Sequence, residues 1–300
     1  MEIFRTPDER FANLPGFGFE PHYAEVGGLR MHHLDEGEGD PVVCFHGEPT
    51  WAYLYRTMLP PLVAGRQRVI CPDYAGFGRS DKPTDRGWYS YDRHLEQVAG
   101  VLEGLDLNEA TVVVQDWGGP IGLRWAVEHA DRVARLVILN TGLFTGHVSE
   151  GFLAWRDFAR RNPDLPVGFV LQGGTSTELA DEVLAAYEAP FPTLESKAGA
   201  AQFPLLVPTE QGAPGAAEML GVAEALRGWD KPALVAFSDQ DPIFPYPAAG
   251  EQFTGMIPGA GEQVCIEGAS HFLQEDRGEQ IAEHVLRFIR ACGEDEPSVR

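Results

Sequence analysis

The stretch VVVQDWGG, residues 112–119, decides how this chain folds. Its run of valines predicts a buried strand, and the two glycines at its end allow a helix to leave at close range. Asp116 then stands at the apex of the turn between them, in the geometry of a nucleophile elbow, where serine is the more usual residue. A plainer alternative is an ordinary strand-to-helix loop in which Asp116 only caps the helix.

Strand-like and helix-like segments alternate on both sides of this turn. Two paired segments open the chain, and apolar runs typical of buried parallel strands follow, at 41–45, 68–72, 110–114 and 133–139. Apolar residues recur with a helical period over 91–105 and 119–129. This order predicts the α/β class, with a mostly parallel sheet flanked by helices.

The alternation stops over residues 144–229, which are rich in Gly, Pro and aromatic residues and helix-like in two places. Strand and helix patterns then resume, at 233–237, 263–266 and 279–290. We therefore expect a main domain formed by 1–143 and 230–300, with a helical cap at 144–229 over the carboxyl edge of the sheet, where open α/β sheets bind ligands. The alternative is a separate second domain.

Composition excludes several classes of protein. The chain has 300 residues, of which 44% are hydrophobic and 23% charged, as in a globular protein with a sizeable core. Its formal net charge is −22, which repels phosphate backbones, so we expect no nucleic-acid partner. The longest apolar runs have the length of strands, so we expect no membrane span.

The cysteines and histidines point to a metal-free protein of a reducing compartment. The four cysteines are scattered and three lie in or beside apolar runs, which favours buried free thiols. The nine histidines form no zinc-binding pattern. The first residues contain charges and prolines throughout, unlike a signal peptide. We expect a cytoplasmic protein without a metal.

Two further segments complete a catalytic set with Asp116. FHGEPTW, residues 45–51, ends a strand, and the backbone N–H groups of Glu48 and Trp117 are placed to converge on one oxyanion. We interpret His46 as a support of this loop. His271 lies after the last strand, where a base is expected when the chain order is nucleophile, acid, base.

The acid must lie between the nucleophile and the base. The segment FSDQDP, residues 237–242, ends a strand and offers two carboxylates. We favour Asp241 over Asp239, because Pro242 restricts Asp241 to extended or turn geometry and its carboxylate projects from the loop. Asn140, at the end of an earlier strand, is a neutral amide and does not stabilise an imidazolium as a carboxylate does.

With these motifs the chain resembles the α/β-hydrolase superfamily over essentially its whole length. The segment DYAGFGRS, residues 73–80, is similar to that superfamily's Gly-rich loop. QDWGG together with HGEPTW resembles the haloalkane dehalogenases, in particular the subgroup with Glu after His-Gly and the triad Asp after the cap. The cap segment GFLAWR, 151–156, is similar to the family's segment that carries a second halide-binding Trp. The resemblance implies that Trp117 and Trp155 bind the halide.

The resemblance also implies the reaction and the pocket. A haloalkane is hydrolysed to an alcohol, a halide and a proton through an ester between the alkyl group and Asp116. The partners are a small apolar halogenated substrate, water and a halide ion, with no cofactor. The oligomeric state is left open. The residues expected along the apolar pocket are Phe152, Phe203, Pro204, Val207, Ile243 and Phe272.

Three alternatives remain. An epoxide hydrolase needs acidic O–H donors for its alkoxide, normally two cap tyrosines, and this insert has Tyr187 alone. A fluoroacetate-type dehalogenase needs arginines just after the nucleophile, and the first here is Arg124. A catalytically inactive relative has lost a nucleophile, base, acid or oxyanion donor, and this chain has all four.

Overall fold

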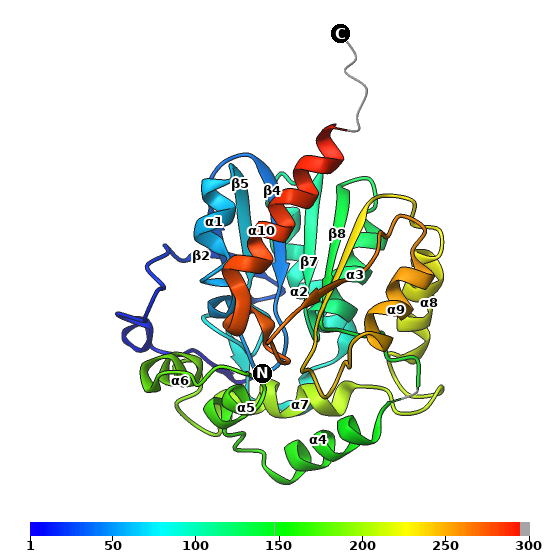
Figure 1. The fold of residues 1–300 in the computed structure, drawn as a ribbon. Helices are drawn as coiled ribbons and strands as arrows, with labels where there is room; N and C mark the ends of the chain where they lie inside the picture. Colours follow the sequence, from blue (N-terminus) through cyan, green and yellow to red (C-terminus); the bar gives the residue numbers. More distant parts are fainter. Residues whose placement is uncertain (147, 295–300) are drawn as a thin grey trace.

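The computed structural model describes residues 1–146 and 148–294 (Figure 1). An eight-stranded sheet in the order β10-β9-β8-β7-β4-β5-β3-β2 forms the centre. Its strands are β2 (His22–Val26), β3 (Leu29–Glu36), β4 (Asp40–Phe45), β5 (Gln67–Pro72), β7 (Ala110–Val114), β8 (Val133–Leu139), β9 (Ala233–Ser238) and β10 (Val264–Ile266). Strand β3 runs antiparallel to both of its neighbours, β2 and β5, and the other neighbouring pairs of this sheet are parallel. A small ribbon pairs β1 (Ile3–Phe4) with β6 (Lys82–Pro83).

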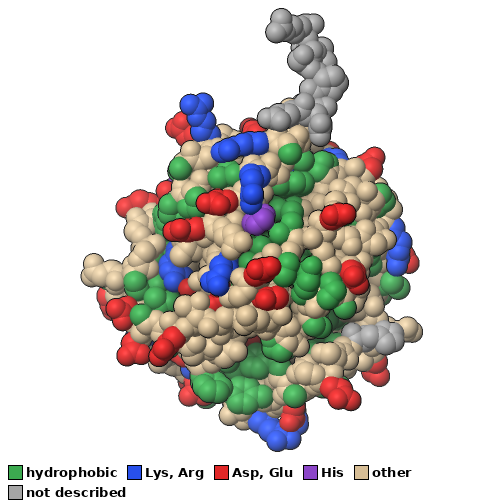
Figure 2. Space-filling view, viewed as in Figure 1, with side chains coloured by type: hydrophobic (Ala, Val, Ile, Leu, Met, Phe, Trp, Pro, Cys, Tyr) green, Lys and Arg blue, Asp and Glu red, His purple; other side chains and the backbone are tan. Residues whose placement is uncertain are grey.

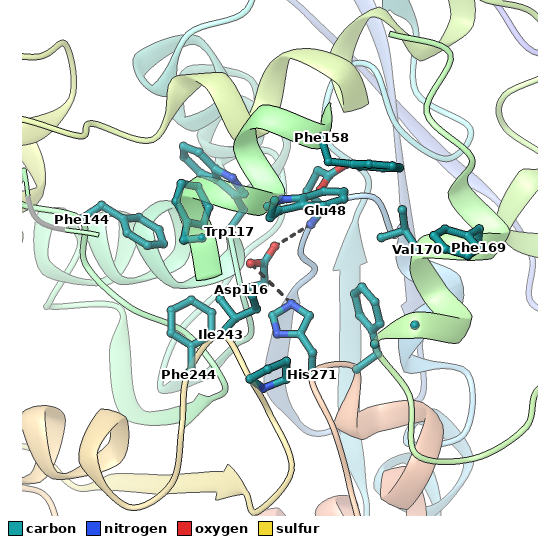
Figure 3. Close-up of a pocket in the computed structure, with 16 residues that line it drawn as sticks. Glu48, Asp116, Trp117, Phe144, Phe158, Phe169, Val170, Ile243, Phe244 and His271 are labelled. Atoms are coloured by element: carbon teal, nitrogen blue, oxygen red, sulfur yellow. Dashed lines mark hydrogen bonds and ion pairs between the residues drawn. The ribbon is translucent and has the colours of Figure 1, made fainter. Parts of the chain in front are cut away.

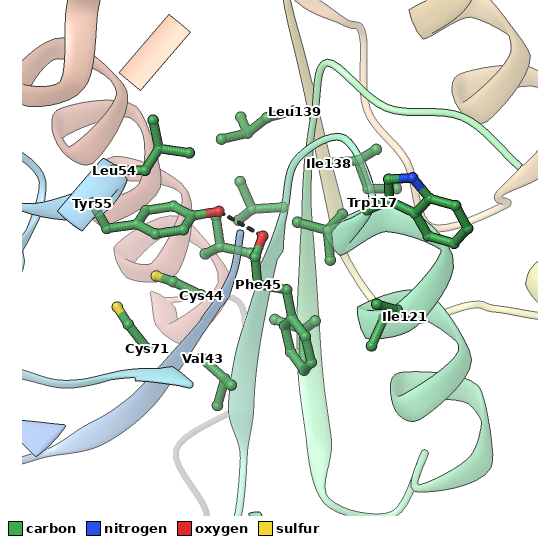
Figure 4. Close-up of a cluster of buried hydrophobic side chains, with 14 of the residues drawn as sticks. Val43, Cys44, Phe45, Leu54, Tyr55, Cys71, Trp117, Ile121, Ile138 and Leu139 are labelled. Atoms are coloured by element: carbon green, nitrogen blue, oxygen red, sulfur yellow. Dashed lines mark hydrogen bonds between the residues drawn. The ribbon is translucent and has the colours of Figure 1, made fainter. Parts of the chain in front are cut away.

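The middle of the sheet is buried on both faces, which explains why its strands are continuous apolar runs. In β7, Val112 lies between Val43 of β4 and Leu136 of β8, and all three side chains are inaccessible to solvent. Figure 4 shows the surrounding cluster, in which the Tyr55 hydroxyl donates to the carbonyl oxygen of Phe45 at 2.8 Å. This packing fixes the end of β7, from which the elbow departs.

Helices cover both faces of the sheet. On one face α1 (Leu59–Ala64) packs against α10 (Leu273–Glu294), which Figure 1 shows in front of the strands. Behind the strands, α3 (Gly118–Glu128) packs against α2 (Tyr91–Glu103) and α8 (Ala216–Leu226). Helix α9 (Ala248–Met256) packs against β9. The described residues contain no helix that combines the length and the apolar character needed to cross a bilayer.

The segment between β8 and β9 contains four helices that form a layer at the bottom of Figure 1: α4 (Glu150–Arg161), α5 (Val167–Gly173), α6 (Asp181–Glu188) and α7 (Ala198–Leu206). Within the layer α4 packs on α7 and α5 on α6. The following helix, α8, packs on α3 beside the sheet. The last part of the segment predicted as a cap therefore lies against the main domain.

The alternation of strands and helices predicted from the sequence agrees with the structure to within a few residues at most boundaries. Strand β9 pairs with β8, so one sheet continues across the insert. The sequence did not predict α1, α5, α7, α8 or α9. These are short or rich in Ala and Gly and carry weak amphipathic patterns, so packing rather than periodicity defines them.

Candidate active site

The turn after β7 has the strained backbone of a nucleophile elbow. Asp116 has a φ of +49°, in the left-handed region that most residues avoid. Its N–H donates to the carbonyl oxygen of Asn140 at 2.8 Å, and its carbonyl oxygen accepts from the Thr141 hydroxyl at 2.5 Å. A Cβ on Gly118 would overlap the backbone of Phe45. The N-cap residue of α3 is Trp117, so the simple capping role for Asp116 is wrong.

Backbone donors hold one oxygen of the Asp116 carboxylate. The N–H of Glu48 donates to Oδ1 at 2.8 Å (Figure 3). A Cβ on Gly47 would overlap the Asp116 side chain, so only glycine fits there. Burial raises the pKa of Asp116, while His271 and the N–H groups of Glu48 and Trp117 oppose this rise. The two predicted oxyanion donors thus both act on Asp116.

The imidazole of His271 lies between two carboxylates. Its Nδ1 is 2.9 Å from Oδ2 of Asp241, and its Nε2 is 3.7 Å from Oδ2 of Asp116. Asp241 is buried, and its other oxygen accepts from the N–H of Ile243 at 2.7 Å. Burial lowers the pKa of His271, but Asp241 and Asp116 outweigh it and raise the pKa to about 8.

The other candidates near the site have supporting contacts. Asp239 accepts the N–H of Gly268 at 2.8 Å, and Asp241 is the carboxylate that pairs with Nδ1 of the imidazole. His46 has its Nδ1 2.9 Å from the carbonyl oxygen of Gly47, and its Nε2 accepts the N–H of Tyr74 at 3.3 Å. Both of its nitrogens are thus engaged in holding the loop, as the sequence predicted.

A cavity of about 290 Å³ opens above these groups. Its polar lining side chains are Glu48, Asp116 and His271, at its base (Figure 3). The rest of the wall is mostly aromatic or aliphatic. From the cap come Phe144, Phe152, Trp155, Phe158, Phe169, Val170, Gly173 and Gly174, from the loop after β9 Pro242, Ile243 and Phe244, and from the loop after β10 Phe272, with Trp117 beside Asp116. Such a cavity suits a substrate with almost no hydrogen-bonding groups.

Comparison with known proteins matches residues 40–278 to the alpha/beta hydrolase fold family. A haloalkane dehalogenase of Psychrobacter cryohalolentis is 47% identical over 96% of this chain and 98% of its own length. One of Mycobacterium marinum is 47% identical over 96% of this chain and 100% of its own length. The chain belongs to the haloalkane dehalogenase family. The tetrameric structure of the haloalkane dehalogenase DpaA from Paraglaciecola agarilytica NO2 superimposes with a TM-score of 0.90 at 35% identity, covering 95% of this chain and 97% of that chain.

The two tryptophans predicted to bind halide in this dehalogenase both line the cavity. Trp117 follows Asp116 directly and is buried. Trp155 comes from α4, where its ring stacks on that of Phe158 with centroids 5.8 Å apart. One indole thus comes from the sheet edge and the other from the cap.

Three of the predicted pocket residues, Phe152, Ile243 and Phe272, are in the wall of the dehalogenase cavity, and three are not. Phe203, Pro204 and Val207 are buried in and just after α7. The Phe203 ring packs edge-on against Trp117, with centroids 4.8 Å apart, and so supports the indole from outside the lining. This corrects the expectation that α7 contributes to the wall.

Eight lining residues were missed: Phe144, Phe158, Phe169, Val170, Gly173, Gly174, Pro242 and Phe244. Phe158 lies three residues after Trp155, a spacing that places both on one side of α4 and was a usable signal. Phe169 belongs to a helix that the sequence did not predict and is 72% exposed.

The groups that the rival reactions require lie elsewhere in this dehalogenase. Tyr187 is buried and its hydroxyl donates to Glu275, which also pairs with Arg56, outside the cavity lining. No tyrosine is among the described residues that line the cavity. Arg124 pairs with Asp92 and with Glu128 on the surface of α3. The wall therefore offers no alkoxide donor from tyrosine and no carboxylate clamp from arginine.

Proposed function

We propose that this dehalogenase hydrolyses carbon–halogen bonds of small haloalkanes, with Asp116 as nucleophile, His271 as base and Asp241 as its partner acid. One observation carries the proposal. The Asp116 carboxylate stands at the floor of an apolar cavity, with Oδ1 held by the N–H of Glu48 and Oδ2 toward His271. The two oxygens of one carboxylate thus have different surroundings and suit different tasks.

In the first step Oδ2 attacks the saturated carbon from the side opposite the halogen. A carboxylate is already an anion, so no proton has to be removed before it attacks. The carbon–oxygen bond forms as the carbon–halogen bond breaks, and the halide leaves with the electron pair. The indole N–H groups of Trp117 and Trp155 are the donors that we assign to the halide.

In the second step water attacks the carbonyl carbon of the ester while His271 takes its proton. Negative charge then develops on Oδ1, where the N–H groups of Glu48 and Trp117 stabilise it. As this intermediate collapses, the bond from the carbonyl carbon to Oδ2 breaks and the alcohol leaves with that oxygen. The leaving alkoxide takes up one of the two protons of the water, the other is released through His271, and the water oxygen stays in the Asp116 carboxylate. Asp241 holds the imidazole in the required orientation and stabilises the imidazolium. Alkylation has already removed the charge of Asp116, which is one of the causes of the raised pKa of His271, so the base becomes easier to deprotonate at the moment it is needed.

The products are an alcohol, a halide ion and a proton, so water and haloalkane are the only reactants in this scheme. We propose a cytoplasmic location, which the four free cysteines support. Glu48 contributes its backbone N–H, and burial together with the neighbouring Asp116 raises the pKa of its side chain well above the ordinary value.

The test is a halide-release assay with iodohexane and ethylene dibromide, run beside styrene oxide and fluoroacetate. We expect halide and acid from the haloalkanes and negligible turnover of the other two compounds. In His271→Ala the alkylation step remains and hydrolysis stops, so the intact mass rises by one alkyl group. An unmodified mass after long incubation with a substrate of the wild-type enzyme excludes Asp116 as the nucleophile.

A further inference from the structure

The carboxylate of Asp276, in the first turn of α10, joins two loops that approach the site from different parts of the chain. Its Oδ2 accepts the N–H of Ser270 at 2.9 Å, directly before the base His271. Its Oδ1 accepts the N–H of Thr177 at 2.7 Å, in the cap loop between α5 and α6. The N–H of Ser176 lies within 3.1 Å of both oxygens. Asp276 is itself 9% exposed.

Two more contacts link the same loops. The N–H of Phe272, directly after the base, donates to the carbonyl oxygen of Gly174 at 2.9 Å. The hydroxyl of Ser176 donates to Oε1 of Gln240 at 2.9 Å, and Gln240 directly precedes Asp241. The cap segment 174–177 is therefore bonded directly to the residue after His271 and to the residue before Asp241, and it reaches the residue before His271 through Asp276. Gly174 also lines the cavity.

We propose that Asp276 is a positioning residue, which keeps the cap segment 174–177 and the loop of His271 together as one unit. The imidazole has to keep two distances at once, 2.9 Å from Nδ1 to Asp241 and 3.7 Å from Nε2 to Asp116. Both backbone neighbours of His271 bond to Asp276 or to the cap segment. A shift of this segment therefore displaces the base, but it leaves Asp116 in place, since the elbow is held by β4 and β8.

This inference rests on the proposed two-step reaction and adds a prediction that the reaction alone does not make. Alkylation uses Asp116 and the halide donors, whereas hydrolysis uses His271. Loosening the Asp276 contacts therefore slows hydrolysis more than alkylation. Misplacement of a reacting group by about 1 Å costs roughly a hundredfold in rate, so a tenfold loss is within reach of a small displacement.

The test is rapid-quench kinetics of Asp276→Asn with iodohexane, with separate measurement of the alkyl-enzyme and the alcohol. Asparagine keeps one acceptor oxygen and turns an NH₂ group toward the remaining backbone donors. We expect hydrolysis to slow about tenfold, alkylation to change less than twofold, and the alkyl-enzyme to accumulate. The matched control is Asp239→Asn, which removes a carboxylate that accepts one N–H from the same region, at Gly268, and touches no cap residue; we expect wild-type kinetics.

A second variant acts from the cap side. Thr177→Pro removes the donor closest to Asp276 and leaves the bond to Ser270 intact, so it should slow hydrolysis in the same selective way and lower the pKa read from the pH profile of hydrolysis. If Asp276→Asn does not fold, the kinetics of Thr177→Pro alone test the positioning role of Asp276. Equal slowing of both steps, or no slowing, overturns the positioning role. Absence of any alkyl-enzyme in the wild type instead refutes the proposed function, so the two failures are distinguishable.

Discussion

The floor and the wall of the cavity are built in different ways. The floor consists of the polar groups at the base of the cavity, and each of them has a defined polar partner. Oδ1 of Asp116 accepts the N–H of Glu48, and its Oδ2 faces His271. Nδ1 of His271 pairs with Oδ2 of Asp241, whose other oxygen accepts a backbone N–H. In the wall, the rings of Trp155 and Phe158 on α4 stack on each other, and Phe169 is 72% exposed (Figure 2 shows hydrophobic side chains at the lower edge of the molecule, in the region of α5). We therefore propose that the floor specifies the reaction and the wall specifies the shape of the substrate.

The sharpest way to test this difference between floor and wall is to remove the proposed nucleophile, Asp116. In Asp116→Gly we expect halide release to fall by about four orders of magnitude or more, because no anion remains to attack carbon. We also expect the free energy of unfolding to rise by about 1 kcal/mol, since glycine adopts the left-handed backbone without strain and a buried carboxylate is gone.

Halide assays and urea unfolding measure the two effects of this change. A stability equal to or lower than that of the wild type would show that the elbow carries no strain. Residual activity within a hundredfold of the wild type would contradict the assignment of the nucleophile.

A pair of glycines that line or adjoin the cavity gives the next largest contrast. In Gly47→Ala the new Cβ overlaps the Asp116 side chain, so we expect activity to fall about a hundredfold and stability by about 1–3 kcal/mol. Gly173, at the end of α5, lines the cavity from the cap, and a methyl group added to it would meet no neighbouring side chain or loop within 4 Å. In Gly173→Ala we expect activity within twofold of the wild type and a gain in stability of up to about 1 kcal/mol.

Steady-state kinetics and thermal unfolding of the two variants measure this contrast. Comparable losses in both would mean that the cap constrains the reacting atoms as tightly as the floor does.

The floor should also make stability depend on pH. The folded protein raises the pKa of His271 from 6.5 to about 8, so protonation favours the folded state. This contribution is complete below about pH 6.5 and disappears as the pH rises through about 8; a shift of this size corresponds to about 2 kcal/mol. We expect the difference in unfolding free energy between the wild type and His271→Ala to change in this direction between pH 6 and pH 9. If this difference in unfolding free energy stays constant from pH 6 to pH 9, the ion pair between His271 and Asp241 does not make the stability depend on pH.

The same contrast explains what the sequence predicted and what it did not. Asp116, Trp117, Glu48 and His271 each lie within a short motif at the end of a strand, and parallel strands bring such ends to one edge of a sheet. Asp241 followed from chain order and from Pro242. Local sequence was therefore sufficient to predict which floor residues come together.

The wall was predicted only in part, because its residues meet through packing between segments far apart in the chain. Phe203 has the same apolar character as Phe244, yet its ring lies behind Trp117 while Phe244 lines the cavity. The position of α7 relative to Trp117 decides this, and no pattern within α7 records it. Phe169 lies in a seven-residue helix without a clear periodic signal.

The smallest expected effect concerns Phe169. In Phe169→Ala we expect stability to change by less than about 0.5 kcal/mol, because the side chain is 72% exposed and makes few contacts that folding could lose. Its ring is nevertheless part of the cavity wall, so its loss widens the opening without touching the floor.

The rate of alkylation at saturating bromoethane should stay within twofold of the wild type, whereas KM for bromohexane should change several-fold, since only the longer chain extends to this part of the wall. Phe158→Ala is the matched comparison deeper in the wall, where the lost ring also supports Trp155 through stacking, so KM for both substrates should change. If Phe169→Ala affects the two substrates equally, the Phe169 ring influences the reacting groups on the floor. This result would contradict the proposal that the floor specifies the reaction and the wall specifies the shape of the substrate.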